Sequence, residues 1–132
     1  MRTDFLIVAD AAQVAEGKLY VMGGGWNRVT VTTFPATINM GVALGILVSW
    51  DETNQPHTTT LTLEDEDGQS QMNAVEMRIE VGRPAGAVAG EDQRVLVAVN
   101  GPITLNGPGG YSVIARLGDS ELARTSFRAV LQ

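Results

Sequence analysis

The chain has no cysteine, one histidine and few aromatic residues. Without cysteine it can form no disulfide, no thiolate nucleophile and no cysteine-ligated zinc or iron–sulfur site. This composition fits a reducing compartment, so we expect a cytoplasmic protein. Aromatic residues make up only 5% of the chain, which is low for a protein that stacks sugars on its rings. The composition therefore excludes cysteine chemistry and disfavours sugar binding by aromatic stacking.

Long apolar runs and positive charge are also scarce. The first apolar run, Phe5 to Ala9, stops at Asp10, and no stretch approaches the roughly 20 apolar residues that span a bilayer. The formal net charge is −6, which disfavours general attraction to nucleic acid or anionic lipid. We therefore expect neither nucleic acid nor a membrane as a partner.

The charges are unevenly placed along the chain. No lysine or arginine lies between Arg28 and Arg78, a span rich in aspartate and glutamate, whereas the last part of the chain carries Arg116, Arg124 and Arg128. Opposite-signed ends would steer head-to-tail association. An ordinary solvated acidic surface is the simpler interpretation.

The most regular pattern runs from Ile38 to Trp50. Large apolar residues alternate there with a second set that is mostly small, namely Asn39, Gly41, Ala43, Gly45, Leu47 and Ser49. A period of two predicts a strand whose apolar face lies on a core. The small face indicates that something packs close to it, and we expect a bend or bulge near Gly41 or Gly45.

Shorter alternating segments recur through the chain, separated by turn residues such as Glu16-Gly17-Lys18, Asp67-Gly68 and Gly118-Asp119. No segment of ten or more residues has a helical period. The pattern predicts a single all-β domain, residues 1–132, of eight or nine strands. We expect a two-sheet antiparallel β-sandwich, immunoglobulin-like or jelly-roll-like, with a closed β-barrel as the alternative.

Two acidic turns are weak candidates for a metal site. Asp51 and Glu52 in one, and Asp65 and Asp67 in the other, would offer carboxylate oxygens to Ca²⁺ if both turns lay at one end of the sandwich. The spacing is not that of an EF-hand, and acidic turns commonly serve solubility alone. Trp26, beside three glycines, is the aromatic residue we expect to be most exposed, and it would serve a glycan-binding surface. We expect no cofactor.

His57 is the one histidine, so a hydrolase would have to use it with Asp51 or Glu52. No G-x-S-x-G motif is present to supply a nucleophilic serine. A turn histidine whose ring bonds a neighbouring backbone group is the favoured interpretation. We therefore expect that the protein is not an enzyme.

Several short motifs resemble an uncharacterised family of bacterial β-sandwich proteins classed as a domain of unknown function. They are Asp4-Phe5-Leu6, Gly17-Lys18-Leu19-Tyr20, Gly23-Gly24-Gly25-Trp26, Trp50 with Glu52-Thr53-Asn54, Pro56-His57, Asp67-Gly68, Gly82-Arg83-Pro84, Gly107-Pro108-Gly109, Tyr111 and Glu121-Leu122-Ala123-Arg124. The resemblance implies a fold class and a bacterial setting. It brings no activity, cofactor or catalytic residue.

The leading functional hypothesis is a non-enzymatic protein-interaction or assembly module that binds a protein partner or forms a homo-oligomer. Its predicted interaction face consists of Asn39, Gly41, Ala43, Gly45 and Ser49, together with Trp26. A face of small residues lets another sheet or subunit approach closely. The alternatives are a module that binds calcium or a glycan through the acidic turns and Trp26, and a hydrolase centred on His57.

Overall fold

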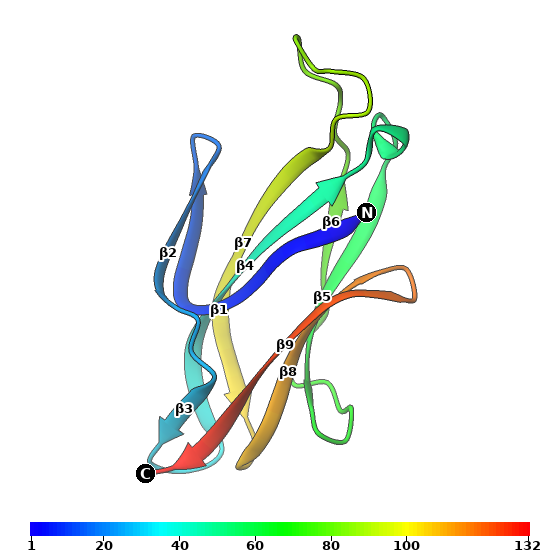
Figure 1. Ribbon diagram of the computed structural model, residues 1–132. Helices are drawn as coiled ribbons and strands as arrows, with labels where there is room; N and C mark the ends of the chain where they lie inside the picture. Colours follow the sequence, from blue (N-terminus) through cyan, green and yellow to red (C-terminus); the bar gives the residue numbers. More distant parts are fainter.

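The computed structural model describes residues 1–132 as nine strands in two sheets (Figure 1). The strands are β1 (Arg2–Ala15), β2 (Lys18–Gly24), β3 (Arg28–Val31), β4 (Ala36–Val48), β5 (His57–Asp65), β6 (Val75–Ile79), β7 (Gln93–Leu105), β8 (Gly109–Leu117) and β9 (Ser120–Leu131). The only helix is a 3₁₀ turn, Trp50–Glu52. The predicted all-β sandwich is therefore confirmed.

The first sheet has the strand order β2-β1-β4-β7 and the second has the order β3-β9-β8-β5-β6. All neighbouring strands are antiparallel except β3 and β9, which are parallel. Both sheets keep open edges, so the closed-barrel alternative is wrong. The free edges are those of β2 and β7 in the first sheet and of β3 and β6 in the second.

The core lies between the sheets and is built on the apolar face of β4. Met40, Val42, Leu44, Ile46 and Val48 are all buried there, as their alternation predicts. The second sheet covers them with a set of buried side chains that includes Leu61, Leu63, Val113 and Phe127. Each large apolar side chain buried in this way contributes roughly 1.5–3 kcal/mol to folding.

β4 has no bulge near Gly41 or Gly45 against β7. It pairs with β7 in unbroken register from Ala36↔Leu105 to Val48↔Gln93. The irregularity lies in β1 instead, between Thr3 and Phe5. β4 ends at Val48, so Trp50 starts the 3₁₀ turn and does not extend the apolar face.

The small face of β4 is covered by the chain's own β1. An added Cβ at Gly45 would clash with the ring of Phe5, and one at Gly41 would lie 2.9 Å from the backbone of Ala11. β1 runs beside β4 as far as Ala9 and then continues as a hairpin with β2 (Figure 1). Gly41 therefore allows β1 to cross close over the sheet.

The side chain of Asn100 in β7 holds β1 in place where β1 crosses the first sheet. Its side-chain Nδ2 donates to the carbonyl of Ala12 at 2.7 Å, and its Oδ1 accepts from the N–H of Ala12 at 2.9 Å. One amide thus satisfies both backbone groups of a residue that lies outside the β1–β4 ladder. The β1–β2 hairpin then projects beyond the rest of the first sheet (Figure 1) and leaves Tyr20 and Met22 exposed.

The glycines at 23–25 carry the chain from the first sheet to the second. Gly23 and Gly25 have φ of 59° and 85°, which side chains other than glycine rarely adopt. The N–H of Gly25 bonds the carbonyl of Val8 at 2.8 Å. The sharp turn that three glycines predict is therefore present, and it delivers Trp26 onto the core.

Candidate functional site

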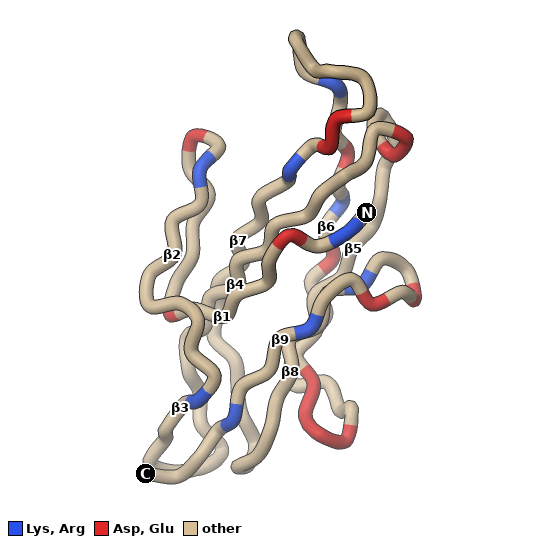
Figure 2. Tube along the Cα trace, viewed as in Figure 1, with Lys and Arg blue, Asp and Glu red and all other residues tan.

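The two acidic turns lie at opposite ends of β5. Asp51 and Glu52 precede the start of the strand, whereas Asp65 closes it and Asp67 follows (Figure 2). No group of three or more histidine, aspartate or glutamate side chains gathers anywhere in the structure. The condition for a shared calcium site, that both turns lie at one end of the sandwich, is not met, because a nine-residue strand separates them by roughly 3.3 Å per residue.

Each acidic turn uses its carboxylates locally. Asp65 Oδ1 accepts from the N–H groups of Asp67 and Gln69 at 3.0 and 2.9 Å. Asp65 Oδ2 accepts from Gln71 at 3.2 Å. The Asp67 and Asp51 side chains stay exposed. These contacts tie the β5–β6 turn, in the manner of an aspartate that organises its own loop.

Glu52 organises the turn that follows β4. Its Oε2 accepts from the amino group of Met1 at 2.5 Å, and its Oε1 accepts from Ser49 Oγ and Ser49 N at 2.7 and 3.1 Å. The Met1 ammonium, followed by the Ser49 bonds, lowers the pKa of Glu52 to about 2, against the opposing effect of desolvation. The Glu52 carboxylate thus has a structural role, because it links Ser49 to the amino group of Met1.

His57 stands at the start of β5 with its ring turned to the same loop. Its Nε2 lies 2.8 Å from the carbonyl oxygen of Glu52. The favoured interpretation of a turn histidine that bonds a backbone group is therefore confirmed. The carboxylate of Glu52 is directed at Met1 and Ser49, so it does not orient the imidazole as an acid–base pair requires.

Arg83 closes this end of the sandwich over Trp50. Its guanidinium lies 3.7 Å from the centre of the Trp50 ring and donates to Trp50 O at 2.9 Å and to Thr53 Oγ1 at 2.8 Å. Thr53 is itself buried and donates to Trp50 O at 2.7 Å. The cation–π contact and these hydrogen bonds give the side chains of Trp50 and Arg83 a structural role.

Trp26 is not the exposed aromatic residue that the sequence predicts. Its ring packs edge-on against Phe127, with 5.3 Å between ring centres, and Phe127 in turn stacks on Tyr111. The indole Nε1 is buried and has no hydrogen-bond partner. The glycine turn places Trp26 on the core, because it brings β3 beside β9. Trp26 is therefore half-buried against the core, and Tyr20 is the exposed aromatic residue instead.

The charge asymmetry of the sequence is largely cancelled within the fold. Arg116 lies on β8 next to β5 and pairs with Glu64 at 2.9 Å, which lowers the pKa of Glu64. Arg128 reaches Glu66 at 3.5 Å. Figure 2 shows acidic and basic residues interspersed over both ends of the molecule. Oppositely charged ends that would steer head-to-tail association are therefore not formed.

Most of the predicted interaction face is covered within the chain. Gly41, Ala43 and Gly45 are buried, with residues of β1 against both glycines, and Ser49 is bonded to Glu52. Asn39 alone among the β4 candidates is exposed. The close packing that small residues predict is therefore present, and β1 of the same chain provides it.

The structure draws attention instead to the edge of β7. This 13-residue strand pairs with β4 along its whole length, and no strand is hydrogen-bonded to its other edge, while its Asn100 side chain bonds the backbone of Ala12 in β1. Residues Val95 to Val99 are each only half-buried, and Arg94 is the one charged residue in the strand. The sequence signal was the uncharged run from Val95 to Leu105, although nothing in that run distinguishes an edge strand from an interior one.

A comparison with protein families matches nearly the whole of this fold, residues 4–130, to a family of unknown function, DUF6941. The chain belongs to the DUF6941 family. The resemblance to an all-β family of unknown function is thereby confirmed. A search of the curated proteins found no match to the chain. Membership in DUF6941 assigns no activity, so a functional conclusion rests on the geometry of the chain itself.

The structure contains no helix of the length and apolarity needed to cross a membrane.

Proposed function

We propose that this protein is a non-enzymatic assembly module that pairs with a second copy of itself along the free edge of β7. The observation that carries the proposal is the one-sided pairing of this strand. All 13 of its residues are in register with β4, and no strand lies on the opposite side. The outward half of its backbone N–H and C=O groups is therefore available to another strand.

The middle of the edge, between Arg94 and Pro102, lacks the devices that usually prevent such pairing. Soluble proteins protect long edge strands with lysine, proline, bulges or inward-pointing charge. β7 has Arg94 near one end and Pro102 near the other, and its register with β4 has no bulge. The six residues from Val95 to Asn100 lie between these two without any charge. This stretch supports strand addition.

A second copy suits the edge because a two-fold axis makes it self-complementary. Such an axis sets two β7 strands antiparallel, so that the Val95–Asn100 stretch of one meets the same stretch of the other. No charged side chain then faces a like charge within the paired stretch. The product is a continuous eight-stranded sheet that buries the half-exposed side chains of Val95, Leu96 and Val97.

The non-enzymatic part of the proposal is supported by the state of the candidate catalytic groups. His57 bonds a backbone carbonyl, and Glu52 is held by Met1 and Ser49. Neither offers the paired geometry on which acid–base catalysis depends. The lack of cysteine supports a cytoplasmic setting for this assembly.

The experiment is the native mass of the purified protein by light scattering over a wide range of concentrations. We expect a species of twice the 14.0 kDa chain mass. Leu96→Lys places a charge within the unguarded stretch and should shift the mass to that of the monomer. Thr104→Lys, on the same outward-facing side of β7 but beyond Pro102, is the matched control and should remain a dimer.

Two outcomes would overturn the proposal. The first is a monomeric wild-type protein at every concentration, which would leave β7 to a different protein partner. The second is a dimer that Leu96→Lys leaves intact while circular dichroism shows the variant to be folded. In that case the copies associate through another surface.

A further inference from the structure

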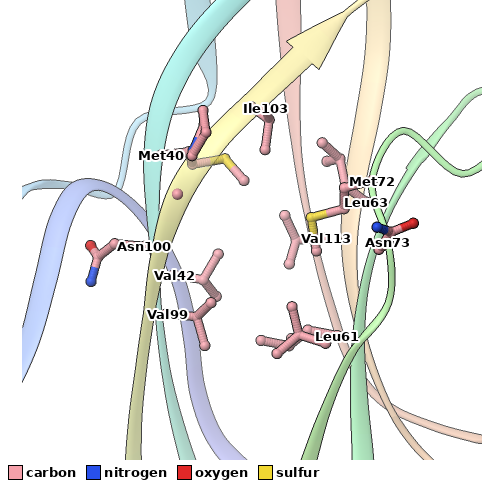
Figure 3. Close-up of a pocket in the computed structure, with 13 residues that line it drawn as sticks. Met40, Val42, Leu61, Leu63, Met72, Asn73, Val99, Asn100, Ile103 and Val113 are labelled. Carbon is pink, nitrogen blue, oxygen red and sulfur yellow. The ribbon is translucent and has the colours of Figure 1, made fainter.

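An apolar pocket of about 210 Å³ opens between the two sheets (Figure 3). β4 and β7 form one wall, and β5, β8 and the segment leading into β6 form the other. Its lining includes Met40, Met72, Asn73, Asn100, Gly101 and Ile103. The pocket lies where the sandwich is open, between the edge strands β7 and β6.

Gly101 is the reason that the pocket exists. Its partner across the ladder is Met40, whose side chain is buried in the core, so a side chain at position 101 would point between the sheets. A Cβ added at Gly101 would meet no atom within 4 Å. The neighbouring inward residues of β7, Val99 and Ile103, both fill their places. The strand therefore omits one core side chain.

The lining excludes polar ligands. Nine of its 13 residues are hydrophobic, and none is ionisable. The two asparagine side chains point away from the gap (Figure 3), and that of Asn100 is engaged by the backbone of Ala12. Met40 and Met72 face each other across the pocket, and flexible thioether side chains adapt to ligands of different shape.

The size of the pocket is sufficient for a small ligand. A cavity of about 150 Å³ lined by leucine, isoleucine and phenylalanine stays dry and takes up benzene. The pocket here is larger and similarly apolar. Water gains few hydrogen bonds inside it, so an apolar molecule that displaces water is favoured.

We propose that this pocket is a binding site for a small uncharged apolar molecule, of the size of a single aromatic ring or a short alkyl chain. The lining is complete within one chain. The proposal therefore stands independently of self-pairing through β7, and the failure of either leaves the other untouched.

The test uses toluene as the probe and the methionine methyl groups as reporters in ¹³C nuclear magnetic resonance. Of the five methionines, Met40 and Met72 line the pocket, whereas Met1, Met22 and Met77 do not. We expect saturable shifts of the Met40 and Met72 signals. Met22 is 62% exposed, so its signal reports non-specific association and should stay in place.

Gly101→Leu fills the pocket with the chain's own side chain and should weaken toluene binding at least tenfold, while raising the melting temperature by several degrees. Gly107→Leu is the matched control, because an added Cβ there also meets no atom within 4 Å but lies outside the pocket. Its affinity for toluene should equal that of wild type. If Gly101→Leu fails to fold, Gly101→Ala adds a single methyl to the same space and should weaken binding several-fold.

The proposal is overturned if the Met40 and Met72 signals do not saturate with toluene. It is equally overturned if they shift to the same extent as Met22, or if a folded Gly101 variant binds toluene as wild type does.

Discussion

Replacing Gly41 with alanine tests whether the crossing of β1 over β4 depends on this glycine. The added Cβ would lie 2.9 Å from both the Cα and the carbonyl carbon of Ala11, and 2.8 Å from Asn100 Oδ1. Two of these three atoms belong to backbone, which cannot rotate away as a side chain can. The strands must therefore separate, or β1 must shift along the sheet.

The expected cost follows from two contributions. Overpacking a tight site costs roughly 1–3 kcal/mol. Displacing the two hydrogen bonds between Asn100 and Ala12 costs about 0.5–1.5 kcal/mol each. Because the two effects overlap, we expect Gly41→Ala to lower the free energy of unfolding by about 2–4 kcal/mol. For a chain of this length, that lowers the melting temperature by roughly 6–15 °C.

Urea unfolding followed by circular dichroism would measure the change, with three variants as controls. Asn100→Ala removes the hydrogen bonds alone and should cost about 1–2 kcal/mol. Gly45→Ala meets the ring of Phe5, which can turn toward solvent, so its cost should be smaller than that of Gly41→Ala. Gly101→Ala enters open space and should stabilise the protein by about 0.4–1 kcal/mol. A Gly41→Ala variant within about 0.5 kcal/mol of wild type, the range typical of surface substitutions, would refute the reasoning.

Two further predictions concern single polar contacts. The pKa of Glu52 in the folded protein is about 2, below its ordinary value of 4.5, so its ion pair with Met1 contributes fully above about pH 4.5 and is lost as the pH falls toward 2. Acid titration of stability should therefore show a loss of about 1–2 kcal/mol that acetylation of the Met1 amine reduces to the smaller part due to the Ser49 bonds, and equal acid sensitivity of both forms would contradict this assignment. Tyr111→Phe removes an O–H that donates to Gly107 O at 2.6 Å, and should cost about 0.5–1.5 kcal/mol in thermal unfolding; an unchanged melting temperature would show that water replaces this bond.

The strands could be predicted from the sequence because their signals are local. Alternation in Ile38–Val48 identifies the buried face of β4, since neighbouring residues in a strand point to opposite sides. The pair Glu16-Gly17 marks the first hairpin turn because both residues adopt positive φ there, at 52° and 72°. The family relationship was also visible, because its motifs are short contiguous stretches.

The candidate sites could not be predicted in the same way, because they depend on which strands become neighbours. The two acidic turns are close in sequence but lie at the two ends of β5, since a strand carries its flanking loops apart. Arg116 and Glu64 are 52 residues apart yet form an ion pair, because β8 pairs with β5. The small residues of β4 correctly indicated close packing but could not show that β1 supplies it.

The sequence by itself determined the class of fold and the buried face of β4, because hydrophobic alternation and turn residues act over a few neighbouring positions. Only the tertiary structure decided that β7 is an edge strand and that Gly101 leaves a pocket between the sheets. Both features arise from strand order and inter-sheet spacing, and these are set by contacts between residues far apart in the chain.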